Sequence, residues 1–187
     1  IRPRANLPSI TTIALVSMLA LSGCGEAPDN VAANAQSHLR EGYSNINRGQ
    51  FRAAIIDARN VIQLLPNDPK GHVLMASIYN KLGDAKNALI ELEKIKGTSD
   101  TYFATLIKSY SLRGKHQSAL NTLLAHPELE EKSKIDYQLM LARAYSGLNK
   151  PVDAIASYQI ILQINPSHVD ALLDLVRYDL FNNEIIK

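Results

Sequence analysis

Three sets of residues recur along this chain at the same spacings, and this periodicity constrains the fold more than any other feature. Alanines are spaced 34, 31 and 35 residues apart, at Ala54, Ala88, Ala119 and Ala154. The same spacings separate the turn-forming residues Gly49, Gly83, Gly114 and Asn149, and a third set at Asn45, Tyr79, Tyr110 and Tyr145. Three markers that repeat in one register predict tandem copies of a single structural unit.

The residue types at these positions indicate what the unit is. Glycine and asparagine tolerate the left-handed backbone conformation that ends one helix and reverses the chain. An alanine early in the next helix allows two helices to approach closely. Pro66 and Pro166 follow apolar runs and cannot continue a helix. Each unit is therefore predicted to be a hairpin of two antiparallel helices.

The pattern Leu141-Ala142, Tyr145, Ala154, Tyr158 resembles the tetratricopeptide-repeat (TPR) family. This resemblance implies an all-α fold, a right-handed α-solenoid of about four hairpins plus the first helix of a fifth. We expect the array to occupy residues 35–187, with units at about 35–68, 69–99, 100–134, 135–168 and a partial unit at 169–187.

Three parts of the array depart from the regular pattern. In the first unit, His38, Glu41 and Asn45 are polar where apolar or aromatic residues are usual, which predicts the polar outer face of a terminal cap. Residues 128–133 form a charged insertion, for which a short extra turn after Pro127 is expected. In the last unit an exposed apolar stripe is expected at Leu172, Leu173, Leu175 and Val176. We therefore expect the natural protein to continue beyond Lys187; the alternative is a single solvating C-terminal helix.

The first residues have the three parts of a secretory signal: Arg2 and Arg4, an apolar run from Ile10 to Ala20, and small residues before Cys24. Leu21-Ser22-Gly23-Cys24 resembles the lipobox of bacterial lipoproteins. The resemblance implies a signal peptide over 1–23, a lipidated Cys24 that begins a flexible tether over 24–34, and a place in the bacterial cell envelope. Because Gly25 is not aspartate, the periplasmic face of the outer membrane is expected.

Charge and motifs exclude several functions. Without Arg2 and Arg4 the 20 basic residues fall to 18, which equals the 18 acidic residues, so the balance does not favour nucleic-acid binding. The five histidines have no metal-site spacing, and His38 with Glu41 is interpreted as a surface pair. Glu91 and Glu93 are interpreted as part of a solvated helix face. No enzyme activity, cofactor, metal or small-molecule substrate is therefore expected.

Function is then expected on the concave surface, which the first helix of every unit lines in TPR proteins. The resemblance places these residues there: Leu39, Tyr43, Asn47, Lys70, Val73, Ser77, Lys81, Thr101, Ala104, Lys108, Leu112, Asp136, Leu139, Arg143 and Ser146. Among them the candidate protein-binding residues are Tyr43, Asn47, Lys70, Ser77, Lys81, Lys108 and Arg143. Three cations, Lys81, Lys108 and Arg143, suit a peptide or partner helix that carries acidic residues. The alternative is that these cations only solubilise the surface.

Residues 36–87 resemble the TPR lipoproteins of exosortase/PEP-CTERM systems, through Gly49-Gln50-Phe51-Arg52-Ala53-Ala54-Ile55 and Leu82-Gly83-Asp84. That resemblance implies a membrane-anchored scaffold for protein–protein interactions in exopolysaccharide or biofilm-matrix export. A second hypothesis is a pilotin-like TPR lipoprotein, which helps a type IV pilus secretin to assemble. A third is the recognition arm of a larger enzyme.

Overall fold

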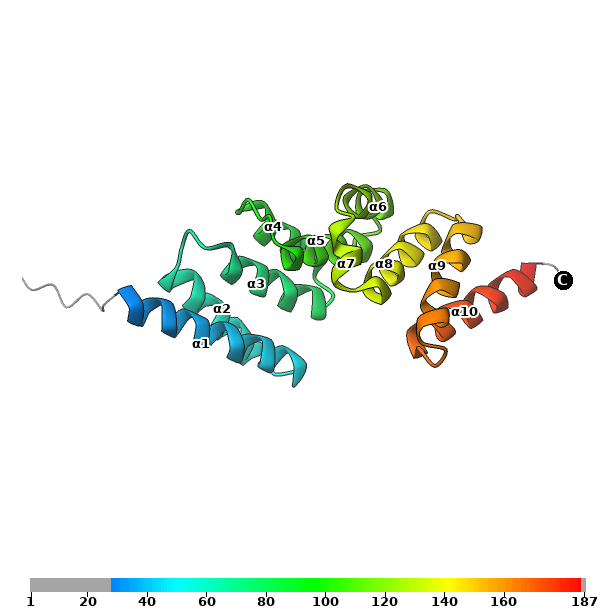
Figure 1. Ribbon diagram of the computed structural model, residues 1–187. Coiled ribbons are helices and arrows are strands. Elements are labelled where there is room, and N and C mark those ends of the chain that lie inside the picture. The colour runs from blue at the N-terminus through cyan, green and yellow to red at the C-terminus, as the bar shows by residue number, and fades with distance from the viewer. Residues whose placement is uncertain (1–27, 186–187) are drawn as a thin grey trace, which may run out of the picture.

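A computed structural model describes residues 28–185, and over this range the chain forms ten α-helices and no β-strand. Figure 1 shows the helices following one another in chain order along one axis, with α1 at one end and α10 at the other. The helices are α1 (Pro28–Asn47), α2 (Phe51–Leu64), α3 (Pro69–Lys81), α4 (Ala85–Glu93), α5 (Asp100–Leu112), α6 (His116–Ala125), α7 (Glu128–Lys132), α8 (Lys134–Gly147), α9 (Pro151–Ile164) and α10 (Val169–Ile185).

Four hairpins share the same turn. The residue that reverses the chain has a positive φ in each of them: 72° at Gly49, 77° at Gly83, 70° at Gly114 and 55° at Asn149. The amide one residue further on donates to the carbonyl of the third marker set, over 2.8 Å from Gln50 to Asn45 and 2.8 Å from Asp84 to Tyr79. The same bond joins Lys115 to Tyr110 and Lys150 to Tyr145. This pattern satisfies a carbonyl at the end of the first helix and sets the direction of the second.

Side-chain caps mark the starts of several helices. The Asp68 carboxylate accepts from the Lys70 amide at 2.9 Å and begins α3, where Pro69 occupies the first turn. Asp84, Ser99 and Ser133 cap α4, α5 and α8 in the same way. Such caps satisfy amides that have no partner inside the helix.

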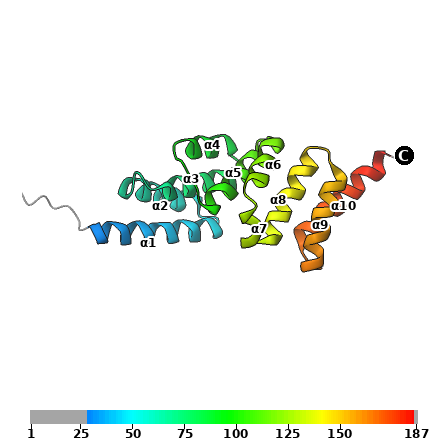
Figure 2. The same ribbon diagram turned by 45° about the horizontal axis from the view of Figure 1, so that its top comes forward.

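The repeated alanines lie where the helices of a hairpin touch. Ala54, Ala88 and Ala119 are fully buried, and Ala154 exposes 1% of its surface. Tyr79, Tyr110 and Tyr145 pack as partly buried side chains against the apolar clusters of these hairpins. The predicted all-α solenoid of helical hairpins is confirmed. In the second view, α4 and α6 lie along one long edge of the array and α1 along the opposite one (Figure 2).

The N-terminal segment departs from the prediction in one respect. The predicted signal peptide and Cys24 lie outside the described residues. A flexible tether was expected to reach residue 34, but α1 is already helical from Pro28. Val31, Ala35 and Leu39 are spaced four residues apart on one face, with Ala35 fully buried and Leu39 7% exposed. This apolar stripe extends the helix backward because it packs on the protein.

The polar residues of the first unit point inward, so the prediction that His38 and Asn45 form a polar outer face is wrong. His38 Nδ1 lies 3.0 Å from an Asp57 carboxylate oxygen on α2, and Asn45 donates to the other oxygen at 2.8 Å. Asn45 is only 7% exposed. Of the three, Glu41 is the one on the outer surface, near Arg48 at 3.8 Å. The Asp57 carboxylate therefore joins α1 to α2.

Two other expectations about irregular segments can be followed in the structure. The insertion forms the one-turn helix α7 directly after Pro127, as predicted. On α10, Leu172, Leu173 and Val176 are 41%, 56% and 54% exposed, as expected for an uncovered stripe. Leu175 differs, because it packs against the core cluster of α8 and α9.

Candidate protein-binding groove

Three hollows form a continuous row along the first helices of the hairpins. The first has a volume of about 340 Å³ and lies between α1, α3 and the start of α5. The second, of about 450 Å³, lies between α3 and α5, and Thr101 lines both. The third, of about 440 Å³, reaches α8 and α10 and shares Lys108 and Leu112 with the second. We call this row the groove.

The first hollow is mainly apolar. Leu39 and Val73 are 7% and 3% exposed and form its buried part, whereas Tyr43 is 36% exposed. Partial burial raises the pKa of the Tyr43 hydroxyl above its ordinary value. Arg40 and Lys70 add positive charge at this hollow, although Lys70 Nζ lies 3.1 Å from a carboxylate oxygen of Asp68.

A buried polar cluster joins α3 to α5 beside the second hollow. The Asn80 amide donates to the Thr105 carbonyl at 3.0 Å, and the Ser109 hydroxyl lies 3.0 Å from the Asn80 side-chain oxygen. Ser109 is fully buried, and Asn80 is 8% exposed. The Ser77 hydroxyl lies 3.3 Å from that of Thr105. These groups satisfy one another, and they fix α3 and α5 as one rigid surface.

Lys81 and Lys108 line the second hollow. Partial burial lowers the pKa of Lys108 below its ordinary value, and the positive charges of Arg143 and Lys81 lower it further, against a smaller opposite effect of Asp170. Within residues 30–177 neither lysine forms an ion pair. No carboxylate of that range therefore lies at ion-pair distance from either ammonium group.

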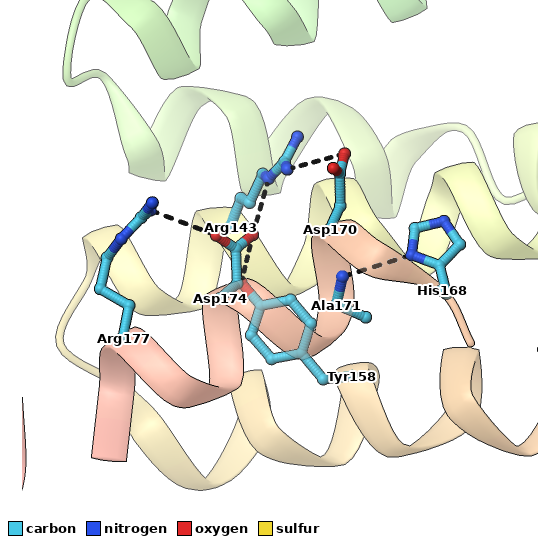
Figure 3. A network of polar contacts seen from close by, with 7 residues as sticks. All are labelled: Arg143, Tyr158, His168, Asp170, Ala171, Asp174 and Arg177. Carbon is cyan, nitrogen blue, oxygen red and sulfur yellow. Dashed lines mark hydrogen bonds and ion pairs between the residues drawn. The ribbon is translucent and has the colours of Figure 1, made fainter. Parts of the chain in front are cut away.

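Arg143 has partners within the chain. Its guanidinium lies 3.1 Å from Asp174 and 3.3 Å from Asp170, both on α10. The Tyr158 hydroxyl on α9 donates to Asp174 at 3.3 Å, and Arg177 lies 3.2 Å from the same carboxylate. Figure 3 shows these side chains converging on Asp174, which is 15% exposed. Burial, together with the Asp174 charge, raises the pKa of Tyr158 to about 12.

The structure brings most of the predicted groove residues together. Tyr43 and Lys70 share the first hollow, Ser77, Lys81 and Lys108 the second, and Lys108 and Arg143 the third. Asn47 lies exposed at the end of α1 and is not among the residues that line these three hollows.

Several residues that line the groove were not predicted from the sequence. Arg40 and Ser99 line the first hollow, Asn80 lies at the second, and Asp170 and Asp174 lie at the third. Arg40 follows directly on Leu39, and a 100° step around the helix keeps it at the edge of the same face. That signal could have found Arg40. The α10 aspartates carry no comparable signal, because their partner belongs to the preceding unit.

Other clusters of polar residues have structural roles. Glu91 was interpreted as solvated, but it is 14% exposed and accepts from His72 at 2.8 Å and from Lys94 at 2.7 Å. Burial alone would raise the pKa of Glu91, but the bonds from Lys94 and His72 lower it below its ordinary value. Across the described residues no group of three potential metal-ligating side chains comes together. None of the helices in that range has the length and hydropathy to cross a membrane.

The described helices form a solenoid of helical hairpins of the TPR type. This fold supports a role as a scaffold for protein–protein interactions. Residues 136–168, the fourth hairpin, match a family model for the tetratricopeptide repeat. A search of curated proteins found no significant match.

Three solved structures share the fold at low sequence identity. Pseudomonas aeruginosa PilF has a TM-score of 0.69 at 15% identity, over 84% of this chain and 72% of that one. MamA has a TM-score of 0.56 at 22% identity, over 70% of this chain and 77% of that one. A thermophilic TPR protein of Thermus thermophilus has a TM-score of 0.51 at 18% identity, over 78% of this chain and 99% of that one.

Proposed function

We propose that this chain is a scaffold of the bacterial cell envelope, anchored to the membrane through a lipid on Cys24, which holds partner proteins in its groove and catalyses no reaction. One observation carries the scaffold role: three adjoining hollows run along α1, α3, α5, α8 and α10, and two of their lysines have no ionic partner within residues 30–177. A surface of this shape and charge suits a protein segment.

The anchor is proposed from the sequence of the leader. Arg2, Arg4, the apolar run and Leu21-Ser22-Gly23-Cys24 support lipidation, and Gly25 supports the outer membrane. For the assembly that the scaffold serves, we propose exopolysaccharide or biofilm-matrix export linked to an exosortase/PEP-CTERM system. The motifs within residues 36–87 support this assignment.

A second candidate is a pilotin-like role in the assembly of a type IV pilus secretin. The likeness in fold to PilF of P. aeruginosa is compatible with it. The anchor and the groove would serve either role, so the two candidates differ in the identity of the partner. The recognition arm of a larger enzyme remains a third hypothesis, which a catalytic domain elsewhere in the same polypeptide would support.

In-cell crosslinking in the native host tests the proposed function. The full-length protein and a Cys24→Ala variant are purified after crosslinking, and co-purifying proteins are identified by mass spectrometry. Capture of export or exosortase components, lost in Cys24→Ala, is the expected result. Capture of a secretin would favour the second candidate. If no envelope protein is captured by the wild type beyond the level of the variant, the proposal is wrong.

A further inference from the structure

We infer that partner binding is confined to the N-terminal half of the groove, where α1, α3 and α5 receive a short protein segment that carries one bulky apolar side chain beside acidic residues. This inference rests on the proposed scaffold function and names the chemistry of its partner. Three features of the groove lead to it: an apolar hollow, a set of unpaired cations and a C-terminal half whose charges are already balanced.

The first hollow is suited to an apolar side chain. Leu39, Tyr43, Pro69 and Val73 are its apolar lining residues, and its volume of about 340 Å³ is near the lower end for ligand pockets, roughly 300–1,000 Å³. Tyr43 leaves 36% of its surface exposed beside the buried side chains of Leu39 and Val73. An aromatic or large aliphatic side chain of a partner would cover it and gain the hydrophobic contribution of that surface.

The charges around this hollow select an acidic segment. Arg40 lies at the first hollow, and Lys81 and Lys108 lie at the second. None of the three has an ionic partner within residues 30–177. The nearby carboxylates are already engaged, because Asp68 pairs with Lys70 at 3.1 Å and Asp100 pairs with Lys132 at 2.9 Å. Carboxylates on a partner would therefore complement this half of the groove.

In the C-terminal half of the groove, the arginines already have carboxylate partners within the chain. At the third hollow, Arg143 and Arg177 are matched by Asp170 and Asp174 through three ion pairs of 3.1–3.3 Å (Figure 3). A partner carboxylate would have to displace Asp174, which also accepts from Tyr158. The binding segment is therefore expected to end near Lys108, where the second and third hollows meet.

A random peptide library, displayed on phage and selected on the whole purified chain at low ionic strength, tests this inference. Enriched peptides are expected to carry an aromatic or large aliphatic residue flanked by aspartate or glutamate. Their affinity, measured by fluorescence polarisation, should fall about tenfold in Tyr43→Ala and in Lys108→Glu. The control variant Lys86→Glu, a charge reversal at an exposed residue of α4, should bind as the wild type does. Arg177→Ala tests the confinement to the N-terminal half, and it should also leave the affinity unchanged. Circular dichroism melting of every variant checks that folding is unchanged.

Several outcomes would overturn the inference. They are enrichment of basic peptides, enrichment of peptides without an apolar residue, binding that depends on Arg177 but not on Tyr43, and no enrichment at all. The scaffold function would survive each of them if in-cell crosslinking still captured an envelope partner. Loss of capture in the cell would instead remove the scaffold function itself.

Discussion

At the residue scale, one backbone position repeats in every hairpin, and the chain fills it with two residue types. Gly49, Gly83 and Gly114 adopt a positive φ, and Asn149 takes the same place with φ 55°. A side chain with a Cβ is strained in this conformation, although asparagine tolerates it better than most residues. No atom lies within 4 Å of a Cβ built on Gly83, so the backbone conformation alone determines what this position accepts.

Gly83→Ala should therefore lower the free energy of unfolding by about 1–2 kcal/mol. Gly83→Asn, which copies the residue used in the fourth hairpin, should lower it less. Urea unfolding followed by circular dichroism measures both. If the two variants were equally destabilised, left-handed strain would not be the reason for glycine at this turn.

At the element scale, the helices of each hairpin are held together by small residues at their contact. Ala88 on α4 is fully buried and belongs to an apolar cluster with Val73, Ala76 and Leu92. Gly71 shows the same close approach between neighbouring units, since a Cβ there would lie 2.7 Å from Ile62 Cγ1 and 3.0 Å from its backbone nitrogen. Larger side chains at these places would push the helices apart.

Ala88→Leu should destabilise the chain by about 1–3 kcal/mol, because its added volume has no space between α3 and α4. Ala156→Leu is the matched control, since Ala156 is exposed on α9. Differential scanning calorimetry should show a lower melting temperature for the first variant and little change for the second. Equal melting temperatures would contradict the contact that we assign to Ala88.

The sequence predicts those parts of the fold that repeat. Each hairpin contains its own turn and its own helix contact, such as those at Gly83, Asn149 and Ala88. Because these features recur in every hairpin, periodicity locates them. The pairing of Arg143 with Asp174 joins two successive units and has no periodic counterpart. His38 was misplaced for a different reason. A polar residue at an apolar position can turn inward when the next helix offers a carboxylate, as Asp57 does for His38 and Glu91 does for His72.

In the candidate site too, the sequence predicts what repeats in every unit but not the contacts between units. The TPR resemblance implied groove positions on the first helices, and among them Tyr43 and Lys108 line the groove in the structure. Whether a cation of the groove has a carboxylate partner depends on distances between units, and a single sequence does not contain these distances. Arg143 and Lys108 look alike in the sequence, but only Arg143 is paired within residues 30–177.

At the scale of the whole molecule, each helix packs mainly on its near neighbours in the chain, as in a linear array. The stability of such an array is close to a sum of unit and interface contributions. The end of the described array depends on Asp174, whose carboxylate on α10 binds Arg143 on α8 and Tyr158 on α9. Loss of this carboxylate should therefore act locally.

Asp174→Ala should accelerate backbone amide exchange in α10 by about 5–30-fold, which corresponds to roughly 1–2 kcal/mol of lost local stability. Exchange in α1 to α4 should stay unchanged. Asp170→Ala serves as the control, because the Asp170 side chain is 56% exposed and its single ion pair contributes little. Hydrogen exchange read by mass spectrometry distinguishes the two variants. A uniform acceleration along the chain would show that the array unfolds as one cooperative unit instead.

The two unpaired lysines also have a consequence for kinetics. Charged groups that line an open groove act mainly on the rate of encounter, and salt largely screens them beyond about 10 Å at 0.1 M ionic strength. Contacts in a desolvated apolar hollow act mainly on the lifetime of a complex. Lys81 and Lys108 would therefore set how often an acidic segment arrives, and the hollow around Tyr43 how long it stays. A change in ionic strength would then alter the speed of capture far more than the residence time.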